Sequence, residues 1–229
     1  MSAPGFYKTP VTKALFYATL GSSVLIPLET RTKLLSLDLS AVLSKGEFYR
    51  LVTNHGPFST TSELVVGLFL LYKFRLFERM LGSEKFGAFV VYATSLATSL
   101  SAGVDLTTSI RPTPGPYPLL YAMFVLHHVL VPPGNPKSFG LFGVDFSNKS
   151  LYYFAGVPLL LSQGTSSVLP GACGALAGWL YANDSMSLQS FRLPKPVERF
   201  CQAFAPIFRG TPPRPLAGPG GQQGQAGRR

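Results

Sequence analysis

One apolar stretch, Val168–Tyr181, constrains the fold more than any other part of the sequence. It reads VLPGACGALAGWLY and places Gly174 and Gly178 four residues apart. On an α-helix, residues four apart lie on one face, and a second helix can approach that face to backbone contact where side chains are missing. The same spacing also occurs in ordinary helix packing, so the pair by itself indicates no particular function. It predicts a helix that is closely packed along one side.

The composition indicates that several such helices lie in a membrane. Of the 229 residues, 46% are hydrophobic and 13% are charged, whereas a soluble domain carries about 25% charged residues. Most of the apolar runs are roughly 15 residues long, which is shorter than the ~20 residues that a helix perpendicular to the membrane needs to cross the hydrocarbon core. We therefore expect a compact bundle in a thin or locally thinned bilayer, such as the endoplasmic reticulum membrane. The alternative is a soluble helical protein with buried helices.

The apolar runs predict an all-α polytopic bundle of six membrane-spanning helices. The expected spans are Ala14–Leu28, a second span with its core at Leu64–Phe74 and a start near Phe58, Phe86–Leu106, Tyr117–Val131, Leu151–Leu161 and Val168–Tyr181. Six spans put both termini on one side, and fifteen of the twenty Lys and Arg residues then lie on that side. The positive-inside rule therefore predicts that both termini are cytosolic.

The segments outside the spans are expected to lie on the membrane surface or to be disordered. Residues 34–43, in the first loop, have a mixed helical periodicity that fits a helix in the interface plane. The six-span domain is expected over residues 1–185 and an amphipathic helix over 186–210. The tail, 211–229, is mostly Pro, Gly, Gln and Arg, which predicts disorder.

The charge and the histidines do not predict a nucleic-acid or metal site. The formal net charge is +10, but the positive residues cluster in the loops between apolar runs, which fits membrane orientation rather than nucleic-acid binding. His127 and His128 are adjacent, so on a helix they point about 100° apart and cannot readily chelate one ion. No Cys, Asp or Glu lies near them in the sequence, and no cofactor is predicted.

Four motifs in sequence order give a family resemblance. The first, Glu47–Thr53, contains Tyr49, whose ring would anchor at headgroup depth, and Arg50, which would reach lipid phosphates. The second is the connector 78–86, the third is the glycine face described above, and the fourth is the helix expected after the last span. The connector's motif residues are Glu78, Arg79, Gly82, Lys85 and Phe86, and we expect them to form a basic turn on the cytosolic side. This order resembles the rhomboid superfamily, in particular its Derlin-related inactive members of the ubiquitin-associated domain-containing type.

The resemblance implies a rhomboid frame without its catalytic residues. In active members the last span reads His-x-x-Gly-x-x-x-Gly, which puts the base position at Gly171 here. Their Gly-x-Ser-Gly motif lies before the fourth span, which puts the nucleophile position at Pro114, beside Gly115. Proline has no hydroxyl and no backbone N–H, and no serine occurs between Ile110 and Val131. We therefore expect no protease activity.

The same resemblance implies a function in protein quality control. Inactive members are proteins of the endoplasmic reticulum membrane that are linked to recognising misfolded or membrane-protein clients. They are linked to passing these clients to ubiquitin ligases and a cytosolic segregase ATPase, or to retaining a partner in that membrane. The family type continues past a polar linker into a ubiquitin-binding domain, whereas this sequence ends in the linker. Direct ubiquitin binding is therefore not implied.

Two alternatives remain open from the residues alone. An active intramembrane serine protease would need a rearranged dyad, with Ser99 or Ser162 beside the His127–His128 pair. A small transporter or channel would need charges inside the membrane. The acidic candidates for that function, Glu63 and Asp105, lie near the ends of expected spans.

Overall fold

The fold is seen in a computed structural model of the whole chain. The structure describes residues 6, 9–27, 30, 46–47, 49–108, 112–131, 139–141, 144–146 and 148–183. The expected interface helix over 34–43, the amphipathic helix within 186–210 and the tail 211–229 lie outside the described residues. These three expectations therefore stay predictions.

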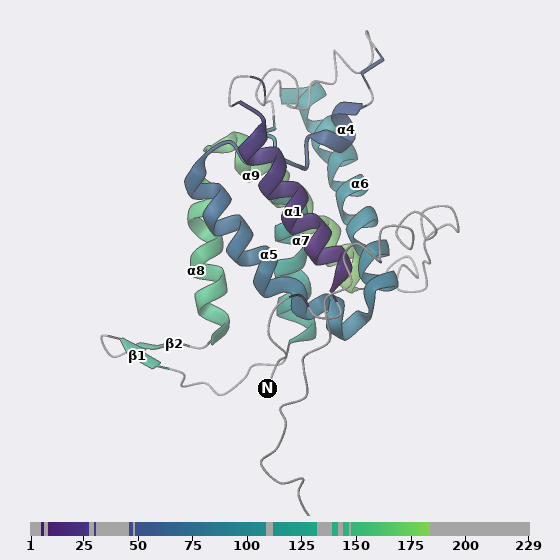
Figure 1. The fold of residues 1–229 in the computed structure, drawn as a ribbon. Helices are drawn as coiled ribbons and strands as arrows, with labels where there is room; N and C mark the ends of the chain where they lie inside the picture. The colour runs from purple at the N-terminus through teal and green to yellow at the C-terminus, as the bar shows by residue number, and fades with distance from the viewer. Residues whose placement is uncertain are drawn as a thin grey trace, which may run out of the picture.

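The described part of the chain contains seven helices and one small hairpin (Figure 1). The helices are α1 (Pro10–Leu25), α4 (Tyr49–Thr53), α5 (Thr61–Leu81), α6 (Ser83–Thr108), α7 (Tyr117–Leu130), α8 (Asn148–Leu161) and α9 (Thr165–Ala182). Strands β1 (Phe139–Leu141) and β2 (Val144–Phe146) pair antiparallel and lie just before the start of α8. Six of the helices correspond in order to the six expected spans.

The expected all-α class is confirmed for the bundle, and the hairpin is a small addition to it. Strands β1 and β2 lie in the segment between α7 and α8, outside the expected spans. Their register pairs Phe139 with Phe146 and Leu141 with Val144. Each strand has only three residues, which is too short for an alternating pattern to be recognised in a sequence.

Helix α5 begins close to the expected start near Phe58 and extends seven residues past the expected core of the span, Leu64–Phe74. A capping box fixes its start: the Thr60 hydroxyl accepts the Glu63 N–H at 3.4 Å, and the Glu63 carboxylate accepts the Thr60 N–H at 3.1 Å. Gly82, with φ of +85°, ends the helix. The expected turn around residues 78–86 is therefore helical on both sides of one glycine. The apolar criterion missed this because charged residues continue a helix beyond its apolar part.

Helix α7 is the most deeply buried helix of the bundle. Most of its residues are buried, and it packs against α5, α6 and α9. Aromatic rings fill much of the core around it, and the largest fully buried side chains include Tyr117, Phe58, Phe74, Phe77, Phe86 and Phe89. The Phe74 and Phe124 rings meet edge-on with centroids 5.0 Å apart. An apolar helix surrounded on all sides is the expected centre of such a bundle.

The glycine face of α9 lies directly against α7. A Cβ atom built on Gly178 would lie 2.7 Å from the Ala122 carbonyl oxygen, and one built on Gly174 would overlap the Pro118 backbone. Neither neighbour is a flexible side chain, so the two backbones are in contact along this line. The absent side chains are what allow α7 and α9 to pack this closely.

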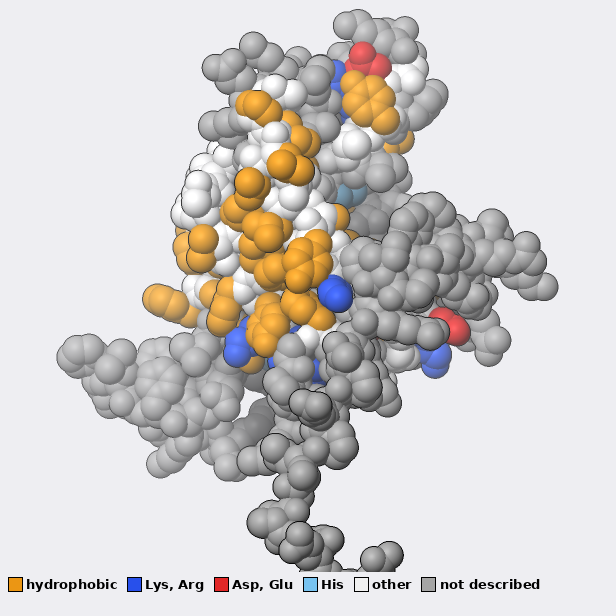
Figure 2. Space-filling view, in the orientation of Figure 1, with side chains coloured by type: hydrophobic (Ala, Val, Ile, Leu, Met, Phe, Trp, Pro, Cys, Tyr) orange, Lys and Arg blue, Asp and Glu red, His pale blue; other side chains and the backbone are white. Residues whose placement is uncertain are grey.

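Hydrophobic side chains cover the face formed by α1 and α5, and basic side chains lie along its lower edge (Figure 2). The exposed apolar residues of these two helices are Tyr17, Val24, Leu25, Val65, Phe69, Leu76 and Met80. Elsewhere Phe154 of α8 is 77% exposed and Trp179 of α9 is 52% exposed. Exposed apolar side chains gathered on one face in this way fit contact with lipid.

By length and apolarity, one helix of the described part is sufficient to cross a membrane. It covers Ser83–Asp105, with 23 residues and a mean hydropathy of 1.4. Two further apolar helices are shorter, Tyr117–Leu130 and Tyr152–Leu161. The expected bundle of six spans is therefore supported in its helices and their order, while the number of crossings stays a prediction.

The backbone contact between α7 and α9 gives the first testable prediction. Gly174→Ala should lower the free energy of unfolding by about 3 kcal/mol, because the new methyl group can be accommodated only if the helices separate. The measurement is thermal unfolding of the full chain in detergent. Gly103→Ala in α6 is the matched control, since a Cβ there meets nothing within 4 Å and alanine favours a helix by roughly 1 kcal/mol. Equal effects of the two substitutions would contradict the contact.

Candidate functional site

The segment that precedes α7 holds the nucleophile position predicted at Pro114. Pro114 is buried, and hydrogen bonds hold the residues on both sides of it. The Thr113 N–H donates to the Ser166 carbonyl at 3.0 Å, and the Gly115 N–H donates to the Asn54 carbonyl at 2.7 Å. The nearest backbone donor is therefore already used within the protein and is not available to an oxyanion.

Gly115 is required at its position by conformation and by space. Its φ is +152°, and a Cβ atom there would lie 2.5 Å from the Tyr117 ring. The Tyr117 ring is fully buried and meets the Phe58 ring edge-on, with centroids 5.6 Å apart. The site that would hold a nucleophile is thus packed with aromatic rings.

The base position, Gly171, lies on α9 between two side chains. A Cβ atom there would lie 2.6 Å from Leu160 Cδ1 and 3.1 Å from Tyr121 Cδ2. The Tyr121 hydroxyl donates a hydrogen bond of 2.7 Å to the Gly156 carbonyl, which fixes its ring between α7 and α8. The structure leaves no room for an imidazole at Gly171 without moving Leu160 and Tyr121.

The rearranged dyad considered as an alternative is not formed by Ser162. His127 is buried against aromatic rings, with its ring centroid 5.2 Å from that of Tyr152 and 6.2 Å from that of Phe74. Ser162 instead follows the far end of α8 and donates to the Leu159 carbonyl at 2.9 Å. Ten residues of helix separate Tyr152 from Ser162, which is about 15 Å.

The other candidates for that dyad, His128 and Ser99, each contact a different partner. His128 is exposed, and its Nδ1 lies 3.4 Å from the Tyr153 hydroxyl. Ser99 is exposed on α6 and donates to the Ser95 carbonyl at 2.9 Å. Within the described residues, no group of three His, Cys, Asp or Glu side chains is placed to hold a metal ion.

The Glu63 carboxylate is buried and joins two parts of the bundle. One of its oxygens accepts the Gln163 side-chain amide at 2.7 Å, and the other accepts the Ser59 and Thr60 backbone N–H groups at 3.1 Å. Gln163 lies in the turn between α8 and α9. Glu63 therefore caps α5 and connects its start to that turn. This is a structural role and differs from the role of an acidic residue in an ion path through the bundle.

Glu78, the first residue of the predicted connector motif, caps the start of α1. One carboxylate oxygen accepts the Val11 N–H at 2.9 Å and the Ser83 hydroxyl at 2.8 Å, and the other accepts the Thr12 N–H and hydroxyl, both at 2.7 Å. Thr9, at the N-cap of α1, makes no side-chain cap hydrogen bond, and no acidic residue lies in the helix's first turn. A carboxylate at a helix N-terminus satisfies free N–H groups and interacts favourably with the helix dipole.

The other connector residues have different environments. Gly82 makes the turn between α5 and α6, and Phe86 is fully buried in the core with its ring 6.3 Å from Phe89. Arg79 is half-buried, whereas Lys85 is exposed. The motif is thus a structural joint, since a capping carboxylate, a turn glycine and a core ring together fix the ends of three helices.

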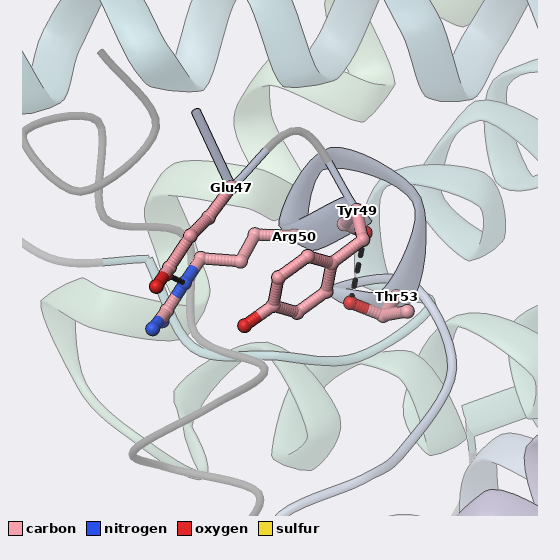
Figure 3. A network of polar contacts seen from close by, with 4 residues as sticks. All are labelled: Glu47, Tyr49, Arg50 and Thr53. Atoms are coloured by element: carbon pink, nitrogen blue, oxygen red, sulfur yellow. Dashed lines mark hydrogen bonds and ion pairs between the residues drawn. The ribbon is translucent and has the colours of Figure 1, made fainter. Parts of the chain in front are cut away.

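Tyr49 and Arg50 lie on the short helix α4 (Figure 3). Arg50 is 8% exposed and pairs with Glu47 through its Nε at 2.5 Å, and the Thr53 hydroxyl donates to the Tyr49 carbonyl at 3.0 Å. The Tyr49 ring is 48% exposed, which fits an interfacial anchor. The structure buries most of the Arg50 side chain and pairs it with Glu47, and the contact of Arg50 with lipid phosphates stays a prediction.

His55 was not predicted as a site residue, yet it links two distant segments. Its Nε2 lies 2.6 Å from the Thr98 hydroxyl of α6. That hydroxyl donates to the Thr94 carbonyl at 2.7 Å, so Nε2 of His55 is the donor in their bond. Burial lowers the pKa of His55 to about 4, so the ring is neutral at pH 7. No local pattern in the sequence signals a bond between residues 43 positions apart.

Comparison with known proteins decides the family. No protein-family model and no solved structure matches the chain. Rhomboid-like protein 18 of Arabidopsis thaliana is 36% identical over 196 residues, which are 83% of this chain and 67% of the relative. The chain belongs to the rhomboid-like family. The resemblance inferred from the motifs is thereby confirmed.

Other relatives narrow the branch of the rhomboid-like family. Ubiquitin-associated domain-containing protein 2 of Mus musculus is 27% identical over 223 residues, 91% of this chain and 64% of the relative. DSC E3 ubiquitin ligase complex subunit 2 of Schizosaccharomyces pombe is 25% identical over 159 residues, 67% of this chain and 42% of the relative. This rhomboid-like chain is therefore a membrane protein of the ubiquitin-associated domain-containing type. It spans about two thirds of the length of the first two relatives.

The Glu78 cap gives the second testable prediction. Glu78→Gln replaces one acceptor oxygen by an NH₂ group that faces two donors, so the free energy of unfolding should fall by roughly 3 kcal/mol. Thermal unfolding in detergent measures this change. Glu84→Gln, six residues along at an exposed position of the first turn of α6, is the matched control and should cost at most roughly 1 kcal/mol. A loss for Glu78→Gln as small as that of the control would show that the cap does not hold α1.

Proposed function

We propose that this chain is a non-catalytic rhomboid-like adaptor of the endoplasmic reticulum membrane that binds membrane-protein clients. One observation carries the proposal: the positions of the nucleophile and the base, Pro114 and Gly171, lack reactive groups and lie in closely packed surroundings. A Cβ atom at Gly171 would already meet Leu160 at 2.6 Å. A bundle with this packing retains the frame of its family and has no place for the proton acceptor.

The proposed arrangement is a six-span bundle made of α1, α5, α6, α7, α8 and α9. Two of these helices are short, since α7 and α8 have 14 residues each, which is about 21 Å. The hydrocarbon core of a typical bilayer is about 30 Å thick. Helices this short favour a thin membrane such as that of the endoplasmic reticulum, or a locally thinned one.

The orientation of the proposed bundle follows from the positive charges. The end of the bundle that holds the α5–α6 turn carries Lys13, Lys73, Arg75, Arg79 and Lys85. Of the described basic residues, Arg50 lies at the opposite end, where it pairs with Glu47. The positive-inside rule then puts the α5–α6 turn in the cytosol, with both termini on the same side.

The proposed mechanism is physical rather than chemical. A thinned bilayer lowers the cost of holding a client segment that carries a polar residue, because that residue lies nearer to water. Client transfer to a ubiquitin ligase is supported by the relative named as a subunit of a DSC E3 ubiquitin ligase complex. A cytosolic segregase ATPase is a further proposed partner, suggested by the family resemblance.

The third prediction concerns partners. Affinity capture of the tagged full chain from gently solubilised membranes should recover components of a ubiquitin ligase, identified by mass spectrometry. An unrelated multi-pass protein of the same membrane, tagged identically, is the control and should not recover them. Repeated capture of the chain without any ligase component would contradict the adaptor function.

The fourth prediction concerns catalysis. The double variant Pro114→Ser, Gly171→His should remain inactive towards a reporter transmembrane substrate and unlabelled by a fluorophosphonate probe, because Leu160 and Tyr121 occupy the space that the imidazole needs. Gel analysis of the reporter and of probe labelling measures this. An active rhomboid protease serves as the positive control. Cleavage by the unmodified chain that is lost in Ser162→Ala or His127→Ala would instead favour the alternative of a protease with an altered dyad.

A further inference from the structure

A small cavity lies where helix ends meet at the basic end of the bundle. Its volume is about 80 Å³. Leu81 and Lys85 line it from the α5–α6 turn, Val129 and Leu130 from the end of α7, and Tyr181 from the end of α9. We call this cavity the Lys85 notch. The notch is separate from the positions of the lost nucleophile and base. Pro114 precedes the start of α7, and Gly171 lies ten positions before Tyr181 on α9.

The walls of the Lys85 notch combine apolar surface with one cation. Val129 is 52% exposed and Leu130 is 36% exposed, so an apolar surface continues out of the notch. Lys85 is exposed, and no described residue forms an ion pair with its ammonium group. Glu84 precedes it by one position and therefore points about 100° away around α6.

The chemistry of the notch fits one kind of ligand. An apolar chain would cover the apolar walls of the notch, and an anion would pair with the lysine at its border. A free phosphate would leave the apolar walls uncovered, and a neutral lipid would leave the lysine unpaired. The surrounding end of the bundle is basic as well, which attracts anionic headgroups. We propose that the Lys85 notch binds one anionic glycerophospholipid, with its phosphate at Lys85 and an acyl chain against Val129.

This site goes beyond the proposed adaptor function and does not depend on it. A lipid at the notch would contact the ends of α6, α7 and α9 together. Two of these helices, α7 and α9, make the close backbone contact, and α6 packs against both. The lipid would therefore join helices that are already neighbours. The chain could bind the lipid whether or not it binds a ligase.

The substitution Leu130→Trp, made together with Trp179→Phe, provides a probe for this site. Leu130 lines the notch and is 36% exposed. Trp179, the only tryptophan in the sequence, lies two residues before Tyr181 and so points about 200° away from it around α9, and Trp179→Phe removes its signal. Bromine atoms on acyl chains quench tryptophan fluorescence at close range. The full chain is placed in phosphatidylcholine nanodiscs that contain a minor fraction of phosphatidylserine, with either one or the other lipid brominated.

The fifth prediction is a selective quenching of the tryptophan fluorescence of the Leu130→Trp, Trp179→Phe chain. Per lipid molecule, brominated phosphatidylserine should quench about fivefold more than brominated phosphatidylcholine, as one lysine near an anionic surface implies. Lys85→Gln should remove this preference. Lys73→Gln, at the same basic end but with its ammonium over the Phe69 ring at 5.4 Å, is the matched control and should keep it.

A second variant tests the apolar part of the notch and does not alter charge. Val129→Phe should reduce the preference by filling the cavity, with Lys85 still present. Equal quenching by the two brominated lipids in the Leu130→Trp, Trp179→Phe chain with Lys85 and Val129 present would overturn the site. So would equal losses in the two lysine variants, which would indicate general surface electrostatics, or a preference unchanged by Val129→Phe.

Discussion

The backbone contact between α7 and α9 is the constraint on which the rest of the structure depends. Gly174 and Gly178 have no side chains, so α9 lies on the backbone of Pro118 and Ala122. The same approach brings Gly171, one turn earlier on α9, against Tyr121 of α7. A helix pair this close leaves no volume for a larger residue at that point. Gly171 also lies against Leu160 of α8, so a larger residue at this position would have to displace side chains of two neighbouring helices.

The charged residues of the bundle hold helix ends together. Glu63 and Glu78 are both buried, and burying a carboxylate is costly unless hydrogen bonds compensate it. Glu78 accepts four such bonds, three of them from residues at the start of α1. The connector motif therefore has a structural explanation: its glutamate replaces the cap that α1 lacks. This account differs from the simple cytosolic turn suggested by its basic residues.

The sequence predicted the helices better than it predicted their contacts. The apolar runs located six helices because these helices are apolar along most of their length, and the glycine spacing of α9 indicated a close neighbour. The partners of Glu78 and His55 could not be predicted, since they lie 66 and 43 positions away and no local pattern encodes them. The burial of Arg50 could not be predicted for the same reason, because burial is set by the whole fold. The family resemblance located Pro114 and Gly171, while only coordinates revealed what fills the space around them.

The unequal helix lengths have a consequence for the proposed mechanism. Helix α6 has 26 residues and α8 has 14, which correspond to about 39 Å and 21 Å, and the two lie on opposite sides of the bundle (Figure 1). If both cross the membrane, as proposed, the bilayer must be thinner beside α8 than beside α6 unless α6 tilts or extends into water. A client segment with a polar residue would then be held at lowest cost beside α8. Phe154, Val157 and Leu161 expose an apolar surface there, so the thin side and the free apolar face coincide.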